Sequence, residues 1–245
     1  MKKSFTILSA ILITLFFSFK ANAQDEETQA KSYMAFLGGL SFPQGNFGSS
    51  VYSNNQAGFA KKGPTLSLDF GIYLYKNFAI GINFAYQDQG ELSDVDAQNL
   101  ATGYLNSYIK DESNVTSQGR YQNIDLMVGP QYSFLYKKFT FDARIDAGPL
   151  KNISTPTYGV VFDNSSNSQT YLTQLNSQSL AFAYGGSLGV RYALSDSWDI
   201  GLRANYIDCS GIKMQTTGPF TTQGRWDTKQ PITELQTTLG ITLKF

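Results

Sequence analysis

The chain has 245 residues, with 19 basic and 19 acidic side chains, no histidine and a single cysteine. A balanced charge without a basic stripe argues against a nucleic-acid partner. The lack of histidine excludes catalysis by a histidine base and removes the usual protein ligand of zinc and copper. Because Cys209 has no second cysteine to pair with, the fold must stand without an internal disulfide.

The N-terminus reads as a cleavable export signal. Lys2 and Lys3 precede an uncharged, mostly apolar run from Phe5 to Phe19, and Ala21-Asn22-Ala23 then supplies a small-x-small cleavage site. The apolar run is too short for a typical spanning helix, so an uncleaved anchor is the weaker alternative. The expected division is a signal peptide at 1–23 cleaved after Ala23, a short periplasmic segment at 24–32, and a membrane domain at 33–245.

Strict alternation of apolar with small or polar residues marks eight segments as β-strands. The last of them shows the pattern plainly, with an apolar face that ends on an aromatic residue (Leu239, Ile241, Leu243 and Phe245). The predicted strands are 33–42, 64–75, 78–88, 120–136, 139–150, 179–194, 197–209 and 231–245.

The connections alternate between short and long. Two-residue turns are expected at Lys76-Asn77, Lys137-Lys138 and Ser195-Asp196. The long polar stretches between them are 43–63, 89–119, 151–178 and 210–230. Short turns at one end and long loops at the other are typical of outer-membrane barrels, whose termini both face the periplasm. The sequence therefore predicts an all-β fold, an eight-stranded antiparallel up-and-down transmembrane β-barrel.

The polar faces of these strands carry ten charged side chains. Each would cost up to about 2–4 kcal/mol if it faced lipid near the membrane centre, so we expect the apolar face outside and the charges in the lumen. Glycines on the same face are expected to make room for long side chains in a narrow barrel (Gly71, Gly81, Gly129, Gly185, Gly189, Gly201 and Gly240). The expected interior charge network is Asp69, Asp125, Asp142, Arg144, Asp146, Arg191, Asp199, Arg203, Glu234 and Lys244.

Outward aromatic residues gather near the strand ends, as expected for two aromatic girdles about 25 Å apart. The alternative is that aromatic residues favour strands at any position. The group near the short turns is Phe78, Phe134, Phe139, Tyr192, Trp198 and Phe245. The group near the long loops is Phe42, Tyr86, Phe182 and Tyr206.

Three motifs stand out along the predicted strands: Tyr86-Gln87-Asp88-Gln89-Gly90, the stretch from Tyr121 to Pro130, and Asp146-Ala147-Gly148-Pro149. In these motifs the chain resembles the outer-membrane β-barrel domain family common in Bacteroidota, which includes the PorT-like proteins. The likeness spans about residues 33–245. It implies an eight-stranded barrel and brings no shared binding or catalytic residue. Small barrels of the OmpX-like and Ail kind have a similar architecture.

Chemical sites have little support in the sequence, and we expect no cofactor, no metal and no enzymatic activity. Asp142, Arg144 and Asp146 are a dense charged cluster, which could hold a catalytic carboxylate pair but fits a charge-paired filling of the lumen better. The acidic loop formed by Asp88, Glu91, Asp94 and Asp96 lacks the spacing of a calcium-binding loop, so we interpret it as solvated.

The long stretches contain predicted structure of their own. Ser93 with Asp96 indicates the start of a helix over 93–110, whose Leu100, Tyr104 and Tyr108 recur at helical spacing and are expected to cover the barrel mouth. Segments 157–163 with 169–175, and 211–217 with 221–226, are expected to extend strands beyond the membrane. Their free edges could pair with a partner strand.

These features predict a non-enzymatic surface or structural protein that contacts outer-membrane lipid and an unidentified extracellular or envelope partner. Loop aromatics are candidate contact anchors (Tyr104, Tyr108, Tyr158, Tyr171, Phe220 and Trp226). The terminal Leu239, Ile241, Leu243 and Phe245 look like a signal for the barrel-assembly machinery. The alternatives are a small passive pore, or an accessory component of an envelope secretion machine.

Overall fold

The computed structural model describes residues 30–54, 56–108, 112–164, 167–218 and 225–245. These residues form eleven strands and one helix. The elements are β1 Tyr33–Pro43, β2 Gly63–Tyr75, β3 Phe78–Asp88, α2 Asp94–Tyr108, β4 Glu112–Gln118, β5 Gln122–Tyr136, β6 Phe139–Ser154, β7 Thr157–Asn164, β8 Asn167–Leu175, β9 Leu180–Ala193, β10 Trp198–Thr217 and β11 Arg225–Lys244.

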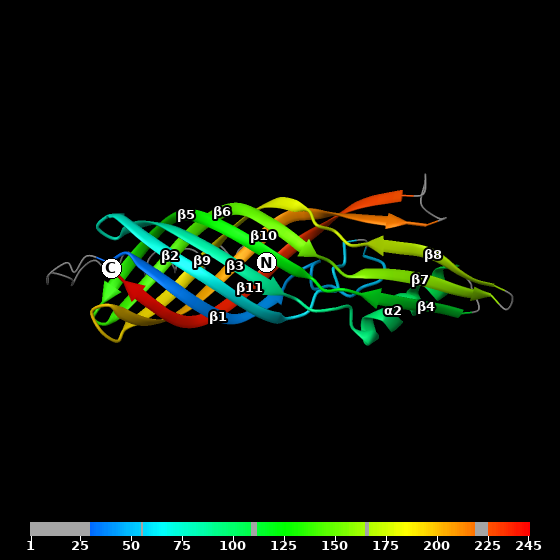
Figure 1. Cartoon of the computed structure of the whole chain (residues 1–245), viewed down its shortest axis with the longest axis horizontal. Helices are drawn as coiled ribbons and strands as arrows, with labels where there is room; N and C mark the ends of the chain where they lie inside the picture. Colours follow the sequence, from blue (N-terminus) through cyan, green and yellow to red (C-terminus); the bar gives the residue numbers. More distant parts are fainter. Residues whose placement is uncertain (1–29, 55, 109–111, 165–166, 219–224) are drawn as a thin grey trace, which may run out of the picture.

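Eight of these strands close into a barrel. Each pairs with the next in the order β1, β2, β3, β5, β6, β9, β10 and β11, every pairing is antiparallel, and β11 pairs back with β1. Figure 1 shows the strands steeply tilted around a common axis. The predicted fold class, an all-β antiparallel up-and-down barrel of eight strands, is confirmed.

The two ends of the barrel differ, and we call them the turn end and the loop end. The turns Lys76-Asn77 and Lys137-Lys138 join strands at the turn end as predicted. The third turn is longer than the predicted two residues and covers 194–197, because the amides of Leu194 and Ser195 both donate to the carbonyl of Trp198 at 2.9 and 3.1 Å. The first residues of β1 pair with the last residues of β11, so the described chain starts and finishes at the turn end.

The outer face of the barrel is apolar, as the alternation predicts. Ile145 and Phe245 are 74% and 71% exposed, and the other large side chains of this face are also exposed or half-buried. At the turn end the lysines Lys137 and Lys138 lie over the rings of Tyr136 and Tyr192, with the ammonium 5.4 and 6.0 Å from the ring centroids. Lysines above an aromatic girdle are typical of a membrane–water boundary, where the ammonium stays in water and the ring lies at the headgroups.

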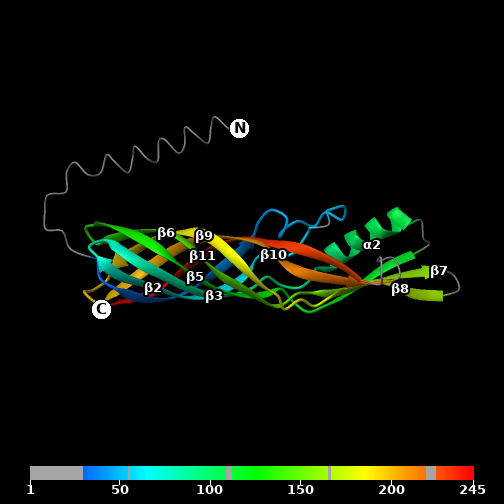
Figure 2. The same ribbon diagram turned by 90° about the horizontal axis from the view of Figure 1, so that it is seen from above.

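Beyond the loop end the chain forms an extension of the barrel. The extension consists of β4, β7 and β8 together with residues 212–217 of β10 and 225–230 of β11; β8 pairs with β10, β7 with β8 and β4 with β7. Figures 1 and 2 show these strands protruding along the barrel axis. The predicted strands at 157–163, 169–175 and 211–217 are confirmed, and most of 221–226 lies outside the described residues.

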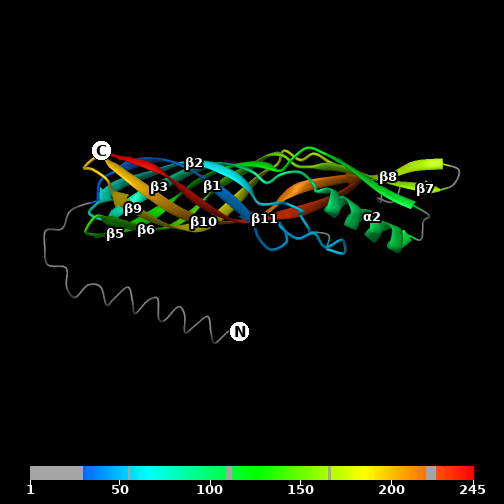
Figure 3. The ribbon, with the colours of Figure 1, turned by 90° about the horizontal axis from the view of Figure 1, so that it is seen from below.

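The predicted helix is confirmed as α2, but its predicted position is wrong. The hydroxyl of Ser93 accepts from the amide of Asp96 at 3.2 Å and donates to its carboxylate at 2.6 Å, which caps the first turn. Leu100 is buried in a cluster with Phe59, Val115 and Val160. The helix therefore packs on the extension rather than over the barrel mouth, as Figure 3 also shows. The side chains of Tyr104 and Tyr108 lie outside the described ones.

No helix in the described part of the chain has the length and apolar character needed to cross a membrane.

Candidate functional site

The middle of the lumen contains a network of arginines and aspartates, which we call the charged layer. Arg144 donates from Nη1 to Asp69 Oδ1 at 2.8 Å, and Arg203 Nη2 lies 3.1 Å from the other oxygen of the same carboxylate. Asp142 pairs with Arg191 at 3.0 Å and with Arg203 at 3.3 Å. Because each charge is buried and has opposite charges beside it, the network avoids the large desolvation cost of an isolated ion.

Tyr33 ties the charged layer together from β1. Its hydroxyl donates to Asp69 at 3.0 Å and accepts from Arg203 at 2.9 Å, while the guanidinium of Arg191 lies 3.8 Å from the centre of its ring. Tyr33 was not among the residues expected in the lumen. Its position in the alternation, two residues before the inward Ala35, was the available signal.

The charged layer continues to the turn end and is balanced. Lys244 and Arg191 both pair with Asp199, at 2.6 and 3.6 Å. Asp146 is close enough to Arg144 and Arg203 for electrostatic interaction. The layer therefore holds four bases and four acids of the ten residues expected in the lumen. The four bases are Arg144, Arg191, Arg203 and Lys244, and the four acids are Asp69, Asp142, Asp146 and Asp199.

Asp125 and Glu234 lie closer to the loop end, in a layer of neutral polar side chains that we call the carboxylate–amide layer. Gln87 donates to Asp125 Oδ2 at 2.5 Å. Glu234 accepts from Ser41 at 2.7 Å, from Gln236 at 3.0 Å, and also from Gln89. Both carboxylates are at most 1% exposed. The glutamines of this layer were not predicted as site residues, although Gln87 and Gln236 lie on polar strand faces and Gln89 directly follows β3.

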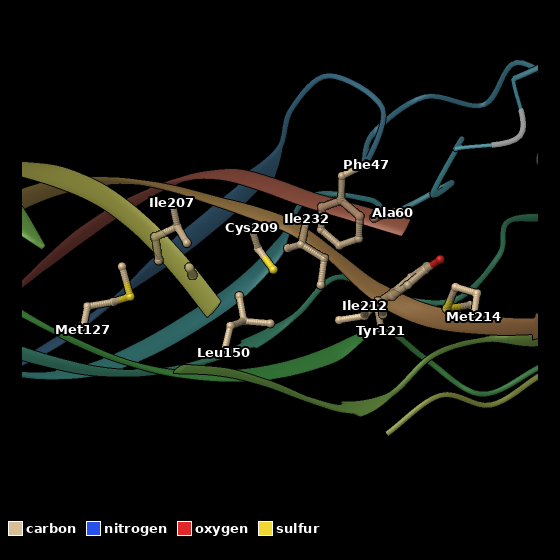
Figure 4. Close-up of a cluster of buried hydrophobic side chains, with 11 residues drawn as sticks. Phe47, Ala60, Tyr121, Met127, Leu150, Ile207, Cys209, Ile212, Met214 and Ile232 are labelled. Atoms are coloured by element: carbon tan, nitrogen blue, oxygen red, sulfur yellow. The ribbon is translucent and has the colours of Figure 1, made fainter. Parts of the chain in front are cut away.

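An apolar plug closes the lumen at the loop end. Along β10 the inward side chains change from Arg203 and Asn205 to Ile207 and Cys209. Phe47, from the loop between β1 and β2, meets the Tyr121 ring edge-on with centroids 5.3 Å apart. Figure 4 shows these side chains converging on one another. The plug consists of Phe47, Ala60, Tyr121, Met127, Leu150, Ala183, Ile207, Cys209, Ile212, Met214 and Ile232.

Inside the barrel, one cavity of about 10 Å³ borders the charged layer and touches Tyr33, Asp69 and Arg203. Such a volume holds about one water molecule. A second cavity of about 10 Å³ lies between the loop carrying Phe59 and the extension, against Tyr121 and Tyr158. Burial raises the pKa of both phenols, which keeps them neutral. Neither space resembles the pocket of several hundred cubic ångströms that a small-molecule ligand needs.

The inward glycines serve two purposes, of which only one was predicted. A Cβ on Gly71 would lie 2.2 Å from the Tyr33 ring, and one on Gly81 would lie 2.0 Å from Arg144 Nε, so these two make room for lumen side chains. Gly189 and Gly201 do the same for Arg203 and Arg191. The prediction is wrong for Gly129, Gly185 and Gly240, where a Cβ would meet a neighbouring strand's backbone oxygen within 2.0 Å. There glycine permits a close strand approach.

Three acidic residues at the end of β3, in the following loop and in α2 form ion pairs in two separate groups. Arg120 reaches Asp88 at 3.0 Å and Glu91 at 2.8 Å, and Lys61 reaches Asp96 at 2.5 Å. The hydrogen bond from Arg120 to Asp88, with the charge of that carboxylate, raises the pKa of the exposed guanidinium. Among the described residues, no group of three or more acidic or cysteine side chains converges on a metal position.

The weaker alternative for Asp142 and Asp146, a catalytic carboxylate pair, gains no support from the geometry. Asp142 is occupied by two arginines and by Ser133, whose hydroxyl donates to it at 2.6 Å. Asp146, four residues along the same strand, interacts with Arg144 and Arg203. Both carboxylates are buried in the charged layer, and a general acid or base must reach a substrate. The arrangement fits ion pairing.

The C-terminal strand closes the barrel. Leu239 and Ile241 are each 55% exposed on the outer face, Leu243 is partly buried there, and the amide of Phe245 donates to the carbonyl of Ser32 at 2.9 Å. Three residues of the predicted assembly signal therefore share the outward face of β11, and the fourth, Phe245, directly follows the strand.

A closed ring of eight antiparallel strands, apolar outside and charged inside, defines a transmembrane β-barrel. The family model of the outer membrane protein beta-barrel domain matches residues 10–230, and the chain belongs to that family. Its location is the bacterial outer membrane, where the apolar face contacts lipid. The comparison with curated protein sequences finds no match.

Solved structures of small outer-membrane barrels are similar to this chain at low sequence identity. Neisserial surface protein A is 13% identical with a TM-score of 0.42, covering 88% of this chain and 98% of its own. A major outer membrane protein from Thermus thermophilus is 11% identical with a TM-score of 0.46, covering 88% and 100%. OprG from Pseudomonas aeruginosa is 13% identical with a TM-score of 0.44, covering 90% and 99%.

Proposed function

We propose that the protein is a non-enzymatic surface protein, in which the barrel is a filled anchor and the extension is the working surface. The observation that carries this proposal is the contrast along the barrel axis. The lumen is occupied by ion pairs, amides and the plug, whereas the long connections fold into a sheet with α2 packed on it. Because short turns face the periplasm in outer-membrane barrels, the extension faces the cell exterior.

The edge of the extension supports strand addition by a partner. In the described residues β4 pairs on one side only, with β7. Its Asn114, Thr116 and Gln118 side chains are exposed although α2 packs against this strand, and an edge strand offers backbone donors and acceptors to an extended segment. The partner that this edge fits is a protein with an extended segment, either an envelope component or a host protein.

The candidate aromatic anchors receive less support than the edge. Tyr158 is partly buried and packs against the cluster around Phe59 and Val160, so it supports the extension from within. The side chains of the other candidates lie outside the described ones (Tyr104, Tyr108, Tyr171, Phe220 and Trp226). We therefore place the contact surface on β4.

Crosslinking in living cells tests this proposal. A photo-crosslinking residue at Asn114 or Thr116 should capture a specific partner, because both side chains are exposed on the β4 edge. The same residue at Asp196, exposed at the turn end, is the matched control and should give a different pattern or none. Mass spectrometry of the adducts identifies the partner.

A shortened variant separates the extension from the anchor. Replacing 92–118 and 157–175 with Asn-Gly turns removes α2, β4, β7 and β8 but keeps Gln89 and Tyr121 in the lumen. We expect a folded, heat-modifiable barrel that no longer copurifies with the partner identified by crosslinking and no longer supports the phenotype of the intact gene. The proposal is wrong if the shortened barrel keeps both properties.

Two alternatives remain as second candidates. A small passive pore needs a continuous water path, and the ion pairs of the charged layer weigh against one. An accessory role in a secretion machine, as in PorT-like proteins, is supported only by the sequence motifs. Capture of secretion components from β4 would favour it.

We also propose that residues 1–23 are an export signal cleaved after Ala23 and that the last strand is read by the barrel-assembly machinery. N-terminal sequencing of protein from outer membranes should begin at Gln24. A chain that still begins at Met1 would contradict cleavage.

The assembly signal is tested at the last residue. Replacing Phe245, which is 71% exposed, by serine should reduce the amount of barrel assembled in cells while leaving refolding in detergent nearly unchanged.

A further inference from the structure

Two acids in the lumen have no base beside them. The charged layer balances four bases with four acids, which leaves Asp125 and Glu234 in the carboxylate–amide layer. In the described part of the chain, no lysine or arginine forms an ion pair with either of them. A buried carboxylate without a counter-charge is strongly unfavourable, and a proton on the carboxyl group removes that cost.

The hydrogen bonds of the two acids differ. Amide nitrogens occupy both oxygens of Glu234, because Gln236 donates to Oε1 at 3.0 Å and Gln89 donates to Oε2. Asp125 accepts from Gln87 at Oδ2, at 2.5 Å, and its Oδ1 is buried without a hydrogen-bond partner. Of the two acids, only Asp125 therefore has an oxygen that can carry a proton without displacing a donor.

The side-chain amide of Gln87 is complementary to a protonated Asp125. In the strand register Asp125 lies opposite Ala85, so Gln87 is its diagonal neighbour on β3. The nitrogen of Gln87 donates to Oδ2, while its oxygen Oε1 is also buried without a hydrogen-bond partner. An amide and a carboxylic acid can form two hydrogen bonds side by side, N–H to the acid and acid O–H to the amide oxygen. One proton on Oδ1 supplies the second bond and satisfies both oxygens.

We propose that Asp125 is a neutral carboxylic acid in the folded barrel, paired with Gln87 through two hydrogen bonds, and that this proton makes the filled lumen sensitive to pH. A free aspartic acid loses its proton at about pH 4, so the unfolded chain is ionised at this residue in neutral solution. Folding then takes up one proton, and the stability of the barrel falls as the pH rises.

The other groups around Asp125 act in the same direction. The charged groups that act on it are Glu234, from the opposite wall on β11, and Asp146 on β6, and both are acids. The remaining neighbours are neutral: β3 contributes Gln87, and Leu150 of the plug lies opposite Asp125 on β6. Ionisation of Asp125 would bring a third negative charge towards two others without a base at ion-pair distance.

Two substitutions distinguish a neutral Asp125 from a carboxylate. Asp125→Asn replaces the acid O–H by an N–H, so both hydrogen bonds to Gln87 remain. Glu234→Gln instead sets its new nitrogen against the amide nitrogen of Gln89 or Gln236. In urea unfolding of the full chain in lipid vesicles, the wild-type midpoint should be lower at about pH 9 than at about pH 5.

The variants should differ in that assay. Asp125→Asn should unfold at the wild-type midpoint in acid and should lose most of the decrease at alkaline pH. Glu234→Gln should unfold at less urea than the wild type at both pH values, because two donors meet there without an acceptor. An Asp125→Asn barrel that is less stable than the wild type at both pH values would contradict the acid–amide pair.

Infrared spectroscopy of the refolded barrel detects the proton directly. A protonated carboxyl group has a C=O stretching band at a higher frequency than carboxylates and amides. We expect this band at neutral pH in the wild type and in Asp196→Asn, which changes an exposed acid of the turn end, but not in Asp125→Asn. Isotope-labelled aspartate should shift the band in the unmutated chain, so the result does not depend on whether Asp125→Asn folds. The proposal is overturned if the wild type lacks the band, or if the band responds only to labelled glutamate.

Discussion

Replacing Asp142 by alanine is expected to lower the free energy of unfolding by about 3–5 kcal/mol, because it leaves buried arginines without their partner. Asp142 pairs with Arg191 and Arg203 and accepts a hydrogen bond from Ser133, and it is 2% exposed. Both guanidiniums are buried, so bulk water cannot replace the lost carboxylate in the native barrel. Urea unfolding in lipid vesicles, followed by the loss of the compact band on gels, measures the effect.

Asp196→Ala is the matched control for Asp142→Ala. Asp196 is exposed in the turn between β9 and β10, so its replacement should change the free energy of unfolding by no more than about 0.5 kcal/mol. Equal, small effects of the two substitutions would show that the charged layer does not support the barrel.

Replacing Gly81 by valine is expected to cost about 3 kcal/mol or more, because overpacking is combined with the loss of a buried ion pair. The new Cβ would lie 2.0 Å from Nε and 2.3 Å from Cζ of Arg144. Arg144 is held by Asp69 and by Gln131 at 2.7 Å, so it cannot move without breaking those contacts. The same urea assay measures the change.

Gly38→Val is the control for Gly81→Val, because it shows how much the loss of any strand glycine costs when no lumen side chain lies beside it. Gly38 lies on the apolar outer face of β1, and a Cβ there would meet only Leu66 Cδ2, at an ordinary 3.5 Å. We expect a change within about 1 kcal/mol, since valine suits a strand and this position faces lipid. The role assigned to Gly81 is wrong if its valine variant is as stable as the Gly38 one.

The strands of the barrel were predictable because the membrane on one side and the lumen on the other require alternating apolar and polar side chains. A membrane outside and a packed lumen inside force period two on every strand, and the predicted 78–88 coincides with β3. The predicted 139–150 is too short, because β6 continues to Ser154. Beyond Leu150 the outward residue is Lys151, so the contrast between the faces disappears where the strand leaves the lipid.

The arrangement inside the lumen was less predictable than its composition. Alternation indicates that Asp69 and Arg144 both face the lumen. They are 75 positions apart in the sequence, and which inward residues meet depends on how far neighbouring strands are shifted along one another. The plug was missed for two reasons. Phe47 comes from a loop without regular alternation, and Ile207 and Cys209 interrupt the polar face of β10. The position of α2 depends on the extension, which forms only when β7 and β8 pair.

The central claim is that the lumen is filled, so that the protein acts from its outer surface rather than as a channel. Planar-bilayer recording of the refolded full chain tests it most directly, with a general porin in the same bilayer as the positive control. We predict no steady conductance steps above the baseline, because Arg144, Arg191 and Arg203 cross the lumen in ion pairs and the plug closes the loop end. Steady, long-lived channels of porin-like conductance would contradict the account.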